Sequence, residues 1–131
     1  MKLLPDTSIW VDYLRERDPD TIAEMDRHLE RESVLICGPV IAELLAGTSP
    51  DQQDELWLSI GSLPWAPVDQ PGWRSIGEVA GELRRAGTSV PLTDVAIAVA
   101  ANAAEAELWT RDDDFGRIKA VLPSLELHGT S

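Results

Sequence analysis

Four acidic residues of this sequence lie beside apolar segments, where a carboxylate is costly to bury. They are Asp6, Glu43, Asp94 and Asp112. A partly buried carboxylate stays ionised only if it is paired, well hydrogen-bonded or bound to a cation, and only Asp112 has a basic neighbour in sequence, Arg111. Clustered carboxylates offer only oxygen ligands, so we expect Mg²⁺ or Mn²⁺. Such an ion activates a bound water and neutralises charge on a phosphodiester, which suits hydrolysis.

Three of the four acids also have simpler explanations. Asp6 is placed to cap a helix that begins at Thr7 or Ser8, and Asp94 suits the positive end of a helix dipole. Asp112 fits an exposed acidic turn. For any one of them alone the simpler explanation is favoured, but capping does not account for Glu43. The functional hypothesis therefore depends on all four converging on one edge of a sheet.

Other catalytic chemistries find little support in the sequence. His28 lies on a polar predicted helix and His128 in the tail, so the two histidines offer no competing chemistry. A zinc site is not expected without a Cys/His cluster. The single cysteine, Cys37, sits in an apolar run and is interpreted as a core residue. Phosphate-binding loops, dinucleotide glycine patterns and nucleophile elbows are also absent from the sequence.

The elements that must position the acids alternate along the chain. Apolar runs predict strands at 2–5, 34–37, 108–110 and 125–127. Helical spacing, caps and breakers predict helices from about 7 or 8 to 14, 20 to 31, 39 to 47, 50 to 61, 73 to 86, 93 to 104 and 114 to 120. This alternation predicts an α/β fold, a three-layer α/β/α sandwich with a short parallel central sheet. Ligands then bind at the carboxyl ends of the strands.

Length and composition define the class of protein. The 131 residues are interpreted as one domain spanning 1–131, with 44% apolar residues and five tryptophans to fill a core. Neither a leader peptide nor a membrane span is expected, so a cytoplasmic location is predicted. The net charge of −12, from 23 acidic against 11 basic residues, argues against a general nucleic-acid binder. It favours a cation site or a basic protein partner.

Four motifs in order make a more specific signal. They are Asp6-Thr7-Ser8-Ile9-Trp10, Glu43-Leu44-Leu45-Ala46-Gly47, Leu92-Thr93-Asp94-Val95-Ala96-Ile97-Ala98, and Thr110-Arg111-Asp112-Asp113-Asp114-Phe115. With this set the sequence resembles the PIN-domain family and, in size, the VapC-type toxins of toxin–antitoxin pairs. The resemblance implies a PIN-like fold and a Mg²⁺- or Mn²⁺-dependent endoribonuclease that cleaves RNA by metal-activated water at a four-carboxylate site.

The resemblance also implies roles for individual residues. Asp6, Asp94 and Asp112 correspond to metal-facing acids, and Glu43 to an acid that ligates through water or orients the nucleophile. Supporting candidates are Ser8, which is equally well placed as a helix cap, Thr110, and Asp114, which stands in for or assists Asp112 because the register of the acidic run is open. Pro5 departs from the family pattern, and we expect it to shorten or shift the first strand and to loosen Asp6.

The implied partners are an RNA substrate, a cognate antitoxin protein and a second copy of the chain in a homodimer, with no membrane. A local basic strip for RNA has the candidates Arg15, Arg17, Arg84, Arg85, Arg111 and Arg117, most of which are better explained as solvated helix charges. Trp10 and Trp109 are interpreted as core residues, and Trp57 and Trp73 as homodimer or antitoxin contacts.

Two other functions remain open at this point. A receiver-type phosphoacceptor domain also gathers acids around Mg²⁺, but it needs a lysine in the acidic pocket, and only Lys2 and Lys119 are present. A non-catalytic PIN-like binding module would keep the fold for assembly with a partner. The presence of all four acids argues against this module.

Overall fold

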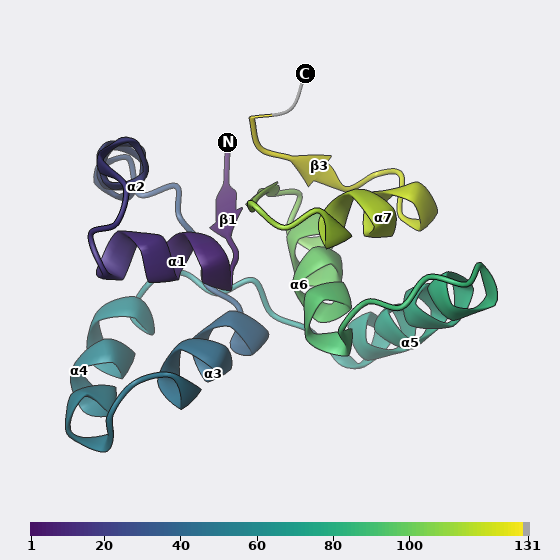
Figure 1. Cartoon of the computed structure of the whole chain (residues 1–131), viewed down its shortest axis with the longest axis horizontal. Helices are drawn as coiled ribbons and strands as arrows, with labels where there is room; N and C mark the ends of the chain where they lie inside the picture. The colour runs from purple at the N-terminus through teal and green to yellow at the C-terminus, as the bar shows by residue number, and fades with distance from the viewer. Residues whose placement is uncertain (130–131) are drawn as a thin grey trace.

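The computed structural model describes residues 1–129. A short parallel sheet lies at its centre (Figure 1). Its strands are β1 (Leu3–Pro5), β2 (Glu107–Trp109) and β3 (Glu126–Leu127), in the order β1-β2-β3. In the register, Leu4 lies opposite Leu108, and Leu108 lies opposite Leu127. The first and last thirds of the chain therefore meet at the centre of the molecule (Figure 1).

The segment 34–37 extends the sheet on the far side of β1, but it forms only single bridges, so the expected regular strand there is wrong. Val34 bridges Leu3 and Ile36 bridges Trp65, both in parallel. Successive backbone N–H groups of a strand point to opposite neighbours. Leu3 donates to Ser33 O at 2.8 Å, and the next donor on that side would be Pro5, which has no N–H. The pairing therefore ends after one bridge.

Pro5 does not loosen Asp6, contrary to expectation. Pro5 lies within β1 opposite Trp109, because its missing donor faces the segment 34–37 and not β2. Asp6 N donates to Trp109 O at 2.9 Å, so the pairing with β2 continues past the proline.

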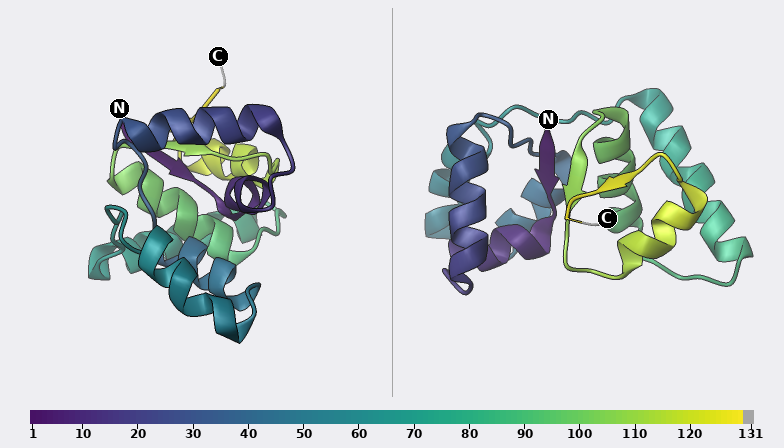
Figure 2. Two further views of the ribbon diagram at one scale, coloured as in Figure 1. Left: turned by 90° about the vertical axis from the view of Figure 1, so that its left-hand side faces the viewer. Right: turned by 90° about the horizontal axis from the view of Figure 1, so that it is seen from above.

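Helices cover the sheet from both sides. They are α1 (Thr7–Leu14), α2 (Pro19–Glu30), α3 (Gly38–Ala46), α4 (Pro50–Ile60), α5 (Gln70–Arg85), α6 (Leu92–Ala103) and α7 (Asp114–Val121). Figure 1 shows α1 and α2 on one side of the strands and α5, α6 and α7 on the other, with α3 and α4 below α1. Figure 2 shows the same layers from two further directions. The expected α/β/α sandwich is confirmed, with element ends shifted by at most three residues.

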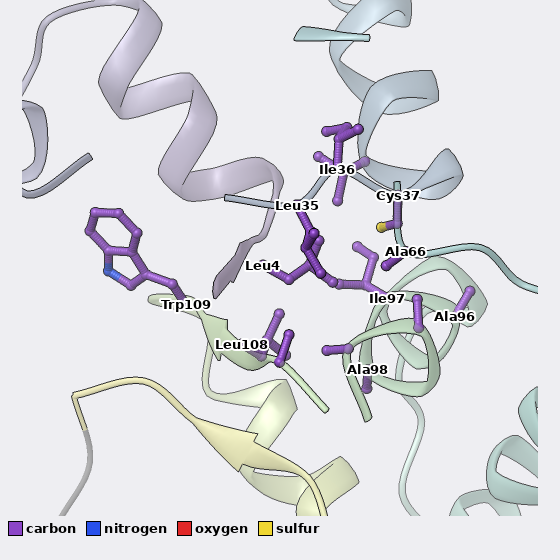
Figure 3. Close-up of a cluster of buried hydrophobic side chains, with 14 of the residues drawn as sticks. Leu4, Leu35, Ile36, Cys37, Ala66, Ala96, Ile97, Ala98, Leu108 and Trp109 are labelled. Carbon is purple, nitrogen blue, oxygen red and sulfur yellow. The ribbon is translucent and has the colours of Figure 1, made fainter. Parts of the chain in front are cut away.

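The core lies where α6 packs against the sheet. Residues 95–101 of α6 are all buried, as expected for a helix that is apolar nearly all round. Figure 3 shows Leu4 and Leu108 on the sheet face near α6, with Trp109 pointing to the opposite side. This opposition follows from the alternation of side chains along a strand. Trp10 and Trp109 are buried, which confirms them as core residues.

Three helices end at a glutamate in the left-handed region. Glu16, Glu32 and Glu105 have φ of 52°, 55° and 55°. Helix α5 ends at Gly87, with φ of 80°, where Gly87 N donates to Arg84 O and Thr88 N to Leu83 O. Glycine adopts this conformation without strain, whereas a residue with a Cβ does not. No helix within residues 1–129 is long and apolar enough to cross a membrane.

Candidate metal centre at the carboxyl ends of the strands

Asp6 is the most buried of the predicted acids, with 4% of its surface exposed. It follows β1 and caps α1: its Oδ1 accepts from Ile9 N at 3.1 Å and from the Ser8 hydroxyl at 2.6 Å. Its Oδ2 accepts from the Thr110 hydroxyl, which follows β2. The capping explanation therefore holds for Asp6 and not for Ser8, whose hydroxyl bonds to the Asp6 carboxylate instead.

Three acids come together beside Asp6. One carboxylate oxygen each from Asp94, Asp112 and Asp114 lie within 4.8 Å of one another. Asp94 enters from the first turn of α6, Asp112 from the loop between β2 and α7, and Asp114 from the first residue of α7. The loop is folded back on itself, because Asp112 N donates to Thr110 Oγ1 at 2.9 Å and Asp114 N donates to Asp112 Oδ1 at 2.9 Å. Asp112 and Asp114 thus both reach the group.

The electrostatics of Asp94 show how strongly these acids interact. The pKa of Asp94 is raised from 3.8 to about 6, by burial first and then by the negative charges of Asp112 and Glu43, followed by those of Asp114 and Asp6. Like charges at this separation resist joint ionisation. An oxygen-only donor set with excess negative charge fits a hard divalent cation such as Mg²⁺ or Mn²⁺.

Glu43 approaches the cluster from α3 but is exposed, as is Asp112. The premise that all four acids sit in partly buried positions is therefore wrong for these two, and it holds for Asp6 and for the half-buried Asp94. Exposure of Glu43 follows from its place on α3 opposite the buried Val40, Ile41 and Leu44. Its Oε1 accepts from the Thr7 hydroxyl at 2.6 Å, which ties the carboxylate to the start of α1.

Thr7 is a site residue that the sequence reasoning missed. Its place in the motif between Asp6 and Ser8 was the available signal. Arg117 was a candidate RNA contact or a solvated helix charge, and its Nη1 lies 2.5 Å from Asp114 Oδ1 across one helical turn. Arg111 points away from the acids: its guanidinium contacts Asp12 and Asp18, both at 3.0 Å, and Thr21. It joins the end of β2 to α1 and α2.

A groove opens beside Glu43 between α1, α3 and α4. It has a volume of about 660 Å³, and its lining includes Val11, Leu44 and Leu56 as well as Arg15. A second, apolar groove of about 520 Å³ lies on the other side of Glu43, where the exposed side chains of Trp73 and Leu92 flank it. Glu43 therefore lies between two surfaces able to hold apolar side chains.

Comparison with known proteins agrees with this architecture. The family model for the PIN domain matches residues 3–121. The chain belongs to the PIN-domain family. The match begins at β1 and ends at the last residue of α7, so it contains every acid of the centre.

Several curated relatives and solved structures are similar to this chain over most of its length. The chain is 32% identical over 124 residues to the VapC ribonuclease Mb1587 of Mycobacterium bovis and to ribonuclease VapC11 of Mycobacterium tuberculosis, with 91% of this chain and 92% of each relative covered. Its fold resembles that in VapBC2 from Rickettsia felis bound to a promoter DNA fragment, with a TM-score of 0.79 and 23% identity over 100% of both chains. DNA-bound VapBC from Salmonella typhimurium gives a TM-score of 0.79 and 21% identity, covering 98% and 97% of the two chains.

Proposed function

We propose that this PIN-domain protein is a Mg²⁺- or Mn²⁺-dependent endoribonuclease and the toxin of a toxin–antitoxin pair. The observation that carries the proposal is the convergence of Asp94, Asp112 and Asp114 on one point beside the buried Asp6. The mycobacterial relatives that match along nine tenths of their length are named ribonucleases, which supports RNA as the substrate class.

The chain's own residues divide the work of the site. Asp94, Asp112 and Asp114 would hold the ion, and Asp6 adds negative charge from the end of β1 while accepting hydrogen bonds from the Ser8 and Thr110 hydroxyls. A bound Mg²⁺ or Mn²⁺ would acidify a coordinated water and neutralise charge on the phosphodiester. Glu43, held by Thr7, accepts a proton or orients the attacking water from the exposed side of the centre.

The partner surfaces follow from the two grooves and the net charge of −12. A solved toxin–antitoxin complex from Klebsiella pneumoniae shares this fold, with a TM-score of 0.69. We place the cognate antitoxin in the groove between α1, α3 and α4, where a basic side chain beside an apolar segment would reach Glu43. The apolar groove flanked by Trp73 and Leu92 is the surface we assign to homodimer formation.

A receiver-type phosphoacceptor function is disfavoured by one observation. The required lysine is not available, because Lys119 Nζ lies 3.2 Å from Pro123 O and also contacts Leu125 O, which ties it between α7 and β3. Lys2 lies at the exposed start of β1, opposite to the acidic edge. If the purified chain takes up no phosphate from a small phosphodonor, the receiver-type function is excluded.

The test is RNA cleavage by the purified chain, free of antitoxin, with Mg²⁺ or Mn²⁺ and with chelator. We expect cleavage only with the divalent ion, and its loss in Asp94→Asn. Asp113→Asn is the matched control, since it removes a charge from the same loop and, among the described residues, its side chain caps no helix. Calorimetric titration with Mn²⁺ distinguishes the enzyme from a non-catalytic binding module. If the wild-type chain neither cleaves RNA nor binds Mn²⁺, the enzyme proposal is refuted.

A further inference from the structure

The two histidines, which the sequence places on a predicted helix and in the tail, meet on the α2 side of the sheet. Their ring centroids are 5.6 Å apart. Glu24 and His28 occupy positions i and i+4 of α2, which places them on one helix face. His128 follows β3 and reaches Glu24 across 104 residues of sequence, with its Nε2 2.6 Å from Glu24 Oε1. One ligand atom each from Glu24, His28 and His128 lie within 4.8 Å of one another.

Each histidine is oriented by a second group behind it. His128 Nδ1 lies 2.8 Å from Glu107 Oε1 on β2. His28 Nδ1 lies 3.3 Å from Ser33 Oγ, and that hydroxyl donates to the His28 carbonyl at 3.1 Å, so the Ser33 oxygen accepts from the ring. The contact of His28 places a proton on its Nδ1 and leaves its Nε2 with a free lone pair. His128 lies between two carboxylates, so its Nε2 carries a proton toward Glu24 in the metal-free protein and would release that proton when an ion binds. An outer partner on Nδ1 is the arrangement that metal-binding histidines use in proteins.

Trp109 forms an apolar wall against this group. Its ring centroid lies 5.6 Å from that of His128 and 6.5 Å from that of His28, and its side chain is buried. The three rings restrict one another, which lowers the entropy lost when the histidines are fixed by a ligand. The polar atoms of the group are themselves partly covered: the side chains of His128 and Glu24 are 18% and 32% exposed.

We propose that Glu24, His28 and His128 bind a transition-metal ion of the zinc class, with Glu107 as the outer partner of His128. Two imidazoles and one carboxylate are a zinc ligand set that leaves one position for water. Ligand atoms around a tetrahedral zinc lie roughly 3.4 Å apart for bonds of about 2.0–2.1 Å. His128 Nε2 and Glu24 Oε1, which are 2.6 Å apart, would separate by about 1 Å to admit the ion, and the ligand atoms of the group all lie within 4.8 Å of one another.

The site differs in chemistry from the acidic centre and would do a different job. Mg²⁺ prefers oxygen ligands in an octahedron, whereas imidazole nitrogen selects zinc-class ions. The ligands come from α2 and from the residue after β3, a strand of only two residues. An ion here would fasten the last strand to the first half of the chain. Its role is therefore structural, and it stands independently of the proposed ribonuclease activity.

The experiment is calorimetric titration of Zn²⁺ into the untagged, metal-stripped chain in excess Mg²⁺, which occupies the oxygen-only centre. We expect one Zn²⁺ per chain, a raised Tm on binding, and affinity at least about tenfold lower in His128→Gln and Glu24→Gln. Glu30→Gln is the matched control, because it removes an exposed acid of the same helix outside the group. It should bind Zn²⁺ like the wild-type chain.

A spectroscopic measurement covers the case in which a variant does not fold. Imidazole nitrogen NMR of the wild-type chain should show Zn²⁺-dependent shifts at Nε2 of both His28 and His128. Absence of Zn²⁺ binding under excess Mg²⁺, Zn²⁺ affinity unchanged in a folded His128→Gln, or shifts at neither histidine would each overturn the proposal.

Discussion

The substitution Asp94→Asn is expected to stabilise the metal-free protein. The folded-state pKa of Asp94, about 6, lies above its ordinary value of 3.8, because of burial first and the charges of Asp112 and Glu43 next. The folded state therefore binds this proton more tightly than the unfolded state does. Stability falls as the pH rises from 3.8 through about 6, and the full penalty is present above that range. An asparagine has no charge to repel and removes the penalty.

The magnitude follows from the size of the shift. A change from 3.8 to about 6 corresponds to at most about 3 kcal/mol at 1.36 kcal/mol per pKa unit. Asp94 is only half-buried, so solvent screening reduces this to roughly 1–2 kcal/mol. The charge also interacts favourably with the N-terminus of α6, and losing that interaction costs about 0.3–1 kcal/mol. We expect a net gain of about 1 kcal/mol in the free energy of unfolding near neutral pH.

The assay is urea unfolding of both proteins in chelator, at neutral pH and again close to pH 4, where Asp94 is protonated in the folded state. The advantage of Asp94→Asn should be present at neutral pH and largely vanish in acid. Other acids titrate in both proteins and cancel in the comparison. Asp113→Asn controls for the general relief of negative charge. An Asp94→Asn protein less stable than wild type at neutral pH, or an advantage independent of pH, would refute the reasoning.

Three further outcomes are expected. Burial raises the pKa of Cys37 from 9.0 to about 11, so at pH 8 its reaction with a disulfide reagent should be at least about 100-fold slower than that of the unfolded chain; equal rates would contradict the packing. Glu105→Gly should raise the unfolding free energy by about 0.5–1 kcal/mol in denaturant, because φ is 55° there, and a loss would contradict the strain. Thr110→Val should lower it by about 1–3 kcal/mol by removing a donor to buried Asp6, while Thr110→Ser keeps the bond and stays near wild type.

The order of elements could be predicted from the sequence because helical periodicity and caps are local signals. Asp18-Pro19 marks a helix start that the structure has, with a side-chain cap on Asp20 N. The helix predicted from 73 begins three residues earlier, at Gln70, because Asp69 caps Gly72 N. The segment 34–37 could not be assigned in the same way. Its apolar residues predict a strand, but the pairing depends on whether the neighbouring strand offers a donor at Pro5, which is a tertiary fact.

The sequence predicted which acids belong to the centre, but it did not predict how buried each of them is. The apolar neighbours correctly indicated that Asp6 is buried, because Asp6 directly follows the buried strand β1. The same signal failed for Glu43, because one helix turn holds both buried and exposed positions. The register of Asp112 and Asp114 stayed open in the sequence, and the loop brings both to Asp94. His28 and His128 are separated by most of the chain, and no local pattern predicts their meeting.

The acids of this centre therefore contribute to stability in opposite ways. Asp6 is the most buried, yet the N–H of Ile9 and the hydroxyls of Ser8 and Thr110 stabilise its charge, and it joins β1 to β2. The charge of Asp94 is destabilised by burial first and by the neighbouring negative charges next. Asparagine at position 6 weakens charge-assisted bonds that hold the fold, whereas asparagine at position 94 relieves repulsion. Loss of cleavage in Asp94→Asn, a variant expected to gain stability, is consequently the stronger evidence for metal-dependent chemistry, because unfolding cannot explain it.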